Sequence, residues 1–132
     1  MKNLFVTGSL LAALGVMLGA FGAHSLKASL EPEQLQIFET GVKYQMYHSL
    51  ALIILSIAGN QYYTSSLRIS ARFFLAGIIL FSGSLYLLSC CQLLGIESWK
   101  SVLGPLTPLG GLCFICGWIG LTIYSLKYPF KK

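Results

Sequence analysis

Polar and apolar positions follow one another along this chain in long blocks rather than in the short alternation of a soluble protein. Four stretches carry no charged residue, namely residues 4–26, 44–67, 73–96 and 101–126. Each one supplies the roughly 20 residues that a helix needs to cross the hydrocarbon layer of a bilayer. The pattern therefore predicts an all-α integral membrane protein, with residues 1–132 forming a single domain of four transmembrane helices.

A shorter amphipathic segment, residues 32–43, precedes the second apolar stretch. Pro32 favours a helix start, because proline fits the first helical turn. The apolar stripe of the segment consists of Leu35, Phe38 and Val42. Glu39 and Lys43 stand four residues apart in the order that supports a helix. We expect a short interfacial helix on the outer membrane surface, which covers polar residues below it as a lid and joins the second span at a hinge, Gly41.

The composition agrees with a membrane protein and leaves no room for a soluble domain. Hydrophobic residues make up 55% of the chain and charged residues 10%, against about 25% charge in soluble domains. The mean hydropathy is +0.73. Lys2 and the apolar run after it resemble a signal peptide, but the run is longer than a usual signal core, so we expect a retained first helix.

The net charge of +5 predicts topology rather than a nucleic-acid partner, because the basic residues are scattered and form no patch. Alternating helices bring six of them to one side: Lys2, Arg68, Arg72, Lys127, Lys131 and Lys132. The other three (Lys27, Lys43 and Lys100) fall on the opposite side together with all four glutamates. The positive-inside rule then predicts that both termini are cytoplasmic.

Small residues recur on one face of the first predicted helix. They are Gly8, Ala12, Gly15, Gly19 and Ala23, at spacings of three and four. Such a face lets another helix approach closely. We expect it to pack against helices of the same chain, and a dimer seam is the alternative. The four cysteines lie inside predicted spans, where thiols behave as small apolar groups, so no disulfide framework is expected.

Three segments of the chain resemble the signature of a known family. They read GAFGAH from Gly19, FETGVKYQMYHSLAL from Phe38 and GPLTPLGGLCFICGW from Gly104. In order and spacing they are similar to a family of small membrane proteins catalogued as domain of unknown function 423, which the eukaryotic transmembrane protein 256 also resembles. The resemblance implies a multi-pass protein of the bacterial cytoplasmic membrane, or of mitochondria in eukaryotic relatives. It implies no activity.

The chemistry-bearing residues of the spans gather, by sequence position, in the outer half of the bundle. The candidate ligand-binding residues are His24, Tyr44, Gln45, His48 and Thr107. His24 ends the first apolar run and His48 lies about one turn inside the second, so we expect the two histidines to approach each other. Polar groups in lipid need partners, so the cluster is either a structural pin between the first two helices or a binding site.

Three function classes stay open at this point. The first is a protein that binds a lipid, a quinone or a small solute in the polar cluster. The second is a structural or assembly subunit that packs against a larger membrane complex, or as a homo-oligomer, through its glycine-rich faces. The third, less favoured, is a metal or haem protein with histidine ligands. An enzyme is not expected, because the chain has no aspartate and no acid within an apolar stretch, and the sequence names no cofactor.

Overall fold

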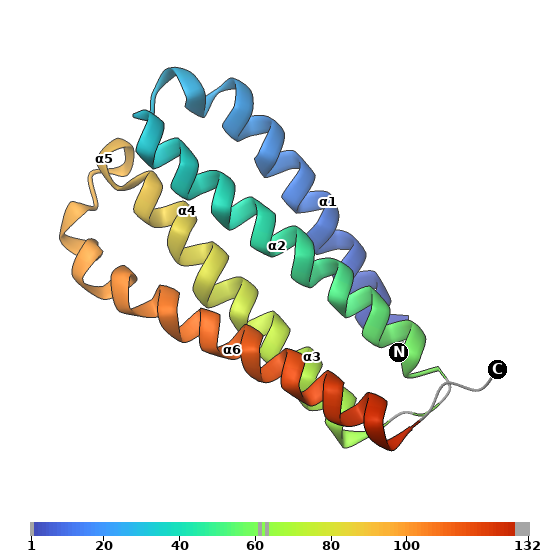
Figure 1. Ribbon diagram of the computed structural model, residues 1–132. Coiled ribbons are helices and arrows are strands. Elements are labelled where there is room, and N and C mark those ends of the chain that lie inside the picture. Colours follow the sequence, from blue (N-terminus) through green and yellow to red (C-terminus); the bar gives the residue numbers. More distant parts are fainter. Residues whose placement is uncertain (1, 61, 63, 129–132) are drawn as a thin grey trace.

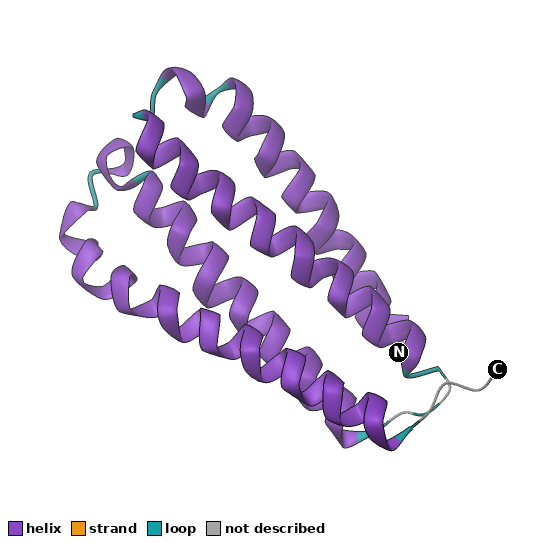
Figure 2. Ribbon diagram, in the orientation of Figure 1, coloured by secondary structure: helices purple, strands orange, loops and turns teal. Residues whose placement is uncertain are grey.

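The computed structural model describes residues 2–60, 62 and 64–128, which form an antiparallel bundle of long helices (Figure 1). The long elements are α1 (Lys2–His24), α2 (Pro32–Ala58), α3 (Ser65–Gly77), α4 (Gly83–Ser89) and α6 (Lys100–Lys127). Short helical turns connect them: η1 (Leu26–Ala28), η2 (Ile78–Ser82), α5 (Cys91–Leu94) and η3 (Glu97–Trp99). Figure 2 shows only helix and loop in the described part of the chain, as the all-α prediction requires.

Among the described residues, three helical stretches are long and apolar enough to cross a membrane: Lys2–Ala28, Ser65–Ser89 and Glu97–Lys127. They correspond to the first, third and fourth predicted spans. The third span begins earlier than expected, since Thr64 caps α3 by accepting a hydrogen bond from the Leu67 amide at 3.4 Å. α2 has sufficient length at 27 residues, but it carries polar side chains that are buried inside the bundle, including Gln45, His48 and Ser49. Its composition is therefore less apolar than that of the three stretches named above.

α2 runs without a break from Pro32 to Ala58, so the prediction of a separate interfacial helix over residues 32–43 is wrong. Its apolar stripe does not rest on lipid. Phe38 is buried and packs on the ring of Tyr86, with ring centroids 4.9 Å apart. Gly41 is not a hinge either: a Cβ at this position would lie 2.8 Å from the Tyr86 ring. The glycine is there because another helix comes close.

α1 packs along α2 through its small residues. A Cβ on Gly8, Gly15, Gly19 or Gly22 would contact α2, at Ser49 and Ile53, Gln45, Val42 and Phe38 respectively. Gly8, Gly15 and Gly19 of the predicted face thus pack within the chain, as expected, whereas Ala23 is exposed. These pairs also fix the antiparallel register of the two helices.

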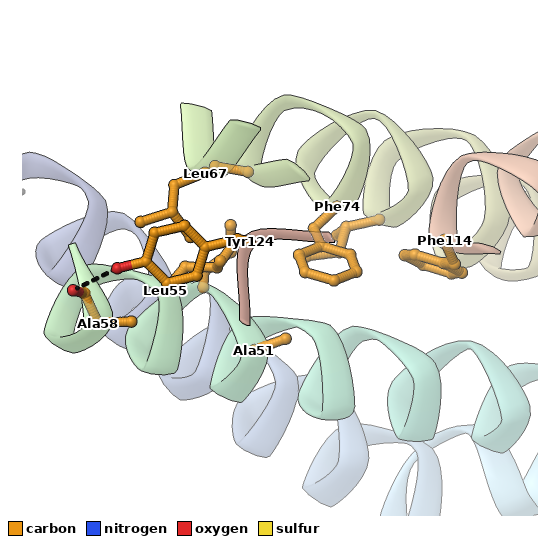
Figure 3. Close-up of a cluster of buried hydrophobic side chains, with 10 residues drawn as sticks. Ala51, Leu55, Ala58, Leu67, Phe74, Phe114 and Tyr124 are labelled. Atoms are coloured by element: carbon orange, nitrogen blue, oxygen red, sulfur yellow. Dashed lines mark hydrogen bonds between the residues drawn. The ribbon is translucent and has the colours of Figure 1, made fainter. Parts of the chain in front are cut away.

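α3, η2 and α4 continue one another as a long helix with a π-helical turn over η2, and α6 packs against it. A side chain on Gly110 would collide with the backbone nitrogen of Phe81, and one on Gly117 with the Phe74 ring. Figure 3 shows the buried side chains between the helices, where the Tyr124 hydroxyl donates a hydrogen bond to the Ala58 carbonyl at 3.2 Å. The four cysteines (Cys90, Cys91, Cys113 and Cys116) are free thiols, as expected.

Candidate functional site

His48 connects α2 with α6 through both nitrogens of its ring. Nδ1 lies 2.8 Å from the carbonyl oxygen of Tyr44, one turn earlier in α2. The indole nitrogen of Trp118 in α6 donates to Nε2 at 3.2 Å. An indole nitrogen can only donate and a carbonyl oxygen can only accept. His48 is therefore a neutral imidazole with its hydrogen on Nδ1, and both nitrogens are occupied.

Aromatic rings fill the space around this histidine. The His48 ring stacks on Phe114 with centroids 3.4 Å apart and planes 6° from parallel. Tyr44 packs against Phe81 at 4.6 Å, and Trp118 meets the edge of Phe74 at 5.1 Å. The backbones of α2 and α6 hardly approach each other, whereas both lie close to the α3–η2–α4 helix. Side chains alone thus bridge α2 and α6.

An open groove of about 760 Å³ lies where these two helices are held apart. Its lining residues are Tyr44, Tyr47, His48, Phe81, Pro108, Gly111, Leu112, Phe114, Ile115 and Trp118. Tyr44 and Trp118 remain 39% and 44% exposed, so the groove opens on the outside of the bundle. It lies near the middle of α2 and α6, and not at their outer ends as the sequence suggested.

The structure distributes the predicted site residues over several places. Tyr44 and His48 line the groove. Gln45 faces the other way, where its Nε2 donates to the Leu11 carbonyl at 2.9 Å and its Oε1 accepts from the Tyr86 hydroxyl at 2.9 Å. Gln45 thereby joins α1, α2 and α4, which is the pin predicted for the histidines. Thr107 pairs with Ser84 of α4 at 2.7 Å between their hydroxyl oxygens and does not line the groove.

His24 does not approach His48, so that prediction is wrong. His24 is exposed at the end of α1. Gly15 faces Gln45 and Gly22 faces Phe38, so His24 lies level with Gln36. That is twelve residues along α2 from His48, or about 18 Å at 1.5 Å per residue. The prediction failed because residues 32–43 extend α2 outward instead of lying in the interface. At this separation the two histidines cannot coordinate one metal ion or one haem iron.

Sequence reasoning missed the residues of α6 that complete the groove. Phe114 and Trp118 are four apart and share a helix face, as Tyr44 and His48 do on α2. The equal spacing of the two ring pairs is a sequence signal that could have suggested that they face each other. In an apolar helix, however, an aromatic side chain that faces lipid looks the same in sequence as one that faces a neighbour.

The part of the chain that the structure describes holds no group of three or more histidine, cysteine or acidic side chains close enough to share a metal ion. Of the residues lining the groove, none is a carboxylate or a thiol. The side chains available to a ligand there are aromatic rings, aliphatic groups and tyrosine hydroxyls.

Comparison with known proteins places the chain in a family. Residues 18–111 match the family described as "Protein of unknown function (DUF423)". The chain is 41% identical over 129 residues to the UPF0382 membrane protein YwdK of Bacillus subtilis, covering 97% of this chain and 99% of the relative. It is 42% identical over 130 residues to the UPF0382 membrane protein SAB0533 of Staphylococcus aureus, covering 97% and 98%. No solved structure matches the chain. The protein is therefore a member of the DUF423 family of uncharacterised membrane proteins, as the three sequence segments had indicated.

Proposed function

We propose that the protein crosses the bacterial cytoplasmic membrane four times. In this proposal α2 spans the membrane in addition to the three apolar stretches, and both termini lie in the cytoplasm. In support, the polar side chains of α2 that would be costly in lipid are buried and bonded inside the bundle, as Gln45 and Ser49 are. Its outward face carries Leu50, Ile54 and Ile57, all exposed. The cations at the ends of the helices favour the cytoplasmic placement of the termini.

Lys43 is compatible with this arrangement. It follows Val42, which faces Gly19 of α1, and Gly19 is five residues, or about 8 Å, from the outer end of α1. Lysine side chains of spans commonly extend along the helix so that the ammonium group reaches the interface. The exposed Lys43 can therefore place its charge among the headgroups.

We propose further that the groove between α2 and α6 binds a lipid-soluble molecule with a flat ring, of the quinone class. The observation that carries this proposal is the open volume of about 760 Å³, which is within the range of small-molecule sites. It lies at mid-depth between helices that only side chains connect. A ligand of this class would reach it from the hydrocarbon layer rather than from water.

The groove's side chains suit the two parts of such a molecule. Aromatic walls stack favourably on a planar ring, and Tyr44 and Phe81 offer them. A quinone carbonyl needs a hydrogen-bond donor, and the hydroxyls of Tyr44 and Tyr47 donate to no residue that the structure describes. His48 is already occupied by Tyr44 and Trp118, so its role is to hold the wall. The proposed activity is binding, without catalysis.

Tryptophan fluorescence tests this proposal directly, because the chain has two tryptophans and Trp118 lines the groove. In a Trp99→Phe background, a short-tailed benzoquinone such as decylubiquinone should quench Trp118 with a saturable curve. Gly111→Leu should abolish the saturable part. A Cβ at Gly111 has only ordinary contacts, 3.8 Å from the Phe81 ring, and the rest of a leucine would extend into the groove.

Gly104→Leu is the matched control, since Gly104 lies on the same helix with nothing within 4 Å of an added Cβ and does not line the groove. In this variant the quinone should quench Trp118 fluorescence with the same saturable curve as in the Trp99→Phe protein. Linear, unsaturable quenching that is the same in both leucine variants would overturn the proposal.

We do not propose the alternative role of a subunit that docks through its glycine-rich faces. Gly8 and Gly15 already contact α2, and Gly110 and Gly117 already contact the α3–η2–α4 helix. The surfaces on which that alternative depended are used inside the chain.

A further inference from the structure

A second cavity, of about 430 Å³, lies between the start of α1 and α3. One side of it carries polar groups, from Lys2, Asn3, Arg68 and Arg72. The other side is apolar and consists of Leu4, Leu67, Ala71 and Leu75. The cavity thus combines three cationic side chains with aliphatic side chains, three of which (Leu67, Ala71 and Leu75) follow one another along α3.

No carboxylate side chain lies near these cations. The chain has four acidic residues: Glu31, Glu33 and Glu39 at the start of α2, and Glu97 in η3. Figure 1 shows those segments at the end of the bundle opposite the start of α1. The charged side chains that line the cavity are therefore all cationic, and an anion there would meet no repulsion from an acidic side chain.

We propose that this cavity binds the phosphate group of an anionic phospholipid, with one acyl chain lying along the leucine side. Basic pockets between helices at the cytoplasmic face are a recurring binding mode for acidic headgroups, and arginine matches phosphate with paired hydrogen-bond donors. Topology alone accounts for cations at this end, but it does not require them to share a cavity with an aliphatic wall. The inference does not depend on the groove between α2 and α6.

The test measures lipid-dependent stability of the purified full-length protein in a non-ionic detergent. Phosphatidylglycerol should raise the Tm in a saturable way, while phosphatidylcholine of the same acyl composition should raise it much less. Each arginine removed should weaken the apparent affinity about fivefold, which corresponds to about 1 kcal/mol per cation. The Arg68→Gln/Arg72→Gln variant should therefore lose most of the response at lipid concentrations that saturate the wild type.

Lys27→Gln/Lys100→Gln is the matched control, because it removes the same charge at the other end of the bundle; it should respond like the wild type. If the arginine variant does not fold, Lys2→Gln, at the exposed start of α1, should weaken the response about fivefold. The lipid assignment is overturned by equal responses to the two lipids, by an equal loss in the control pair, or by inorganic phosphate alone reproducing the full shift.

Discussion

His48 shows how a polar ring is accommodated in an apolar bundle. Burying an imidazole costs free energy unless its nitrogens are hydrogen-bonded, and here Tyr44 and Trp118 satisfy one nitrogen each. The stacked Phe114 ring covers one face of it. His48 thereby helps to hold α2 and α6 at the separation that opens the groove.

Replacing His48 tests this role. His48→Ala should lower the free energy of unfolding by about 2 to 3 kcal/mol, because it removes the stacked ring and leaves the Trp118 indole without its acceptor. His48→Gln should cost about 1 kcal/mol, since a glutamine oxygen can still accept from the indole. Unfolding of the purified protein by denaturant measures both. Equal losses in the two variants would show that the hydrogen bond contributes nothing.

Gly110 is a second position where one atom decides the packing. An alanine there would collide with the Phe81 backbone nitrogen, which cannot move away by a change of rotamer. We expect Gly110→Ala to lower the Tm, with a cost of about 1 to 3 kcal/mol typical of overpacking. Gly104→Ala, with open space around it, should leave the Tm unchanged or raise it, because alanine favours a helix. A Gly110→Ala protein as stable as the wild type would contradict the close approach of α6 and η2.

At the scale of elements, the continuity of α2 determines where every polar residue of the bundle lies. The helix carries its outer turns, with Phe38 and Gly41, into contact with α1 and α4. These contacts move His48 inward, to the middle of the bundle. This inward position separates His48 from His24 and places His48 opposite Trp118.

Hydrogen exchange tests this continuity. The amides of residues 41–45 should exchange as slowly as those of residues 50–54, because each is bonded within one uninterrupted helix. Mass spectrometry of peptides from the exchanged full-length protein provides the measurement. Fast exchange confined to residues 40–44 would restore the hinge at Gly41 and the separate interfacial helix.

Hydropathy and glycine spacing were sufficient to predict the helical class, α1 and α6, because those signals come from within one segment. The prediction of α2 failed because an amphipathic stripe is the same whether it meets lipid or a neighbouring helix. Its partners, Gly22 and Tyr86, are far away in sequence. Tyr44 and His48 were found as unusual residues in an apolar run, whereas Phe114 and Trp118 are ordinary there, so the α6 side of the groove was not identified.

At the scale of the whole molecule, the distribution of charge predicts how the bundle lies in the membrane. The cations Lys2, Arg68, Arg72 and Lys127 mark one end, and the glutamates mark the other. Lys131 and Lys132, which the sequence assigns to the same end as Lys2, lie outside the described residues. This asymmetry supports the proposal of four crossings with both termini in the cytoplasm.

A topology reporter checks this arrangement. A fusion after Lys132 should be active only when the reporter requires the cytoplasm, and a fusion in the connection between α1 and α2 should be active only outside. Three crossings, with α2 lying on the membrane, would place the two ends of the chain on opposite sides. Periplasmic activity of the fusion after Lys132 would therefore contradict the four-span proposal.

The most direct test of the groove is to identify what the protein carries out of its native membrane. Wild type, Gly111→Leu and Gly104→Leu are purified under identical mild conditions, and their lipid-soluble contents are extracted and measured by mass spectrometry per mole of protein. We predict an isoprenoid quinone in near-stoichiometric amount with the wild type and with Gly104→Leu, and its loss from Gly111→Leu. The same extracted compounds in the same amounts from all three proteins would contradict the account.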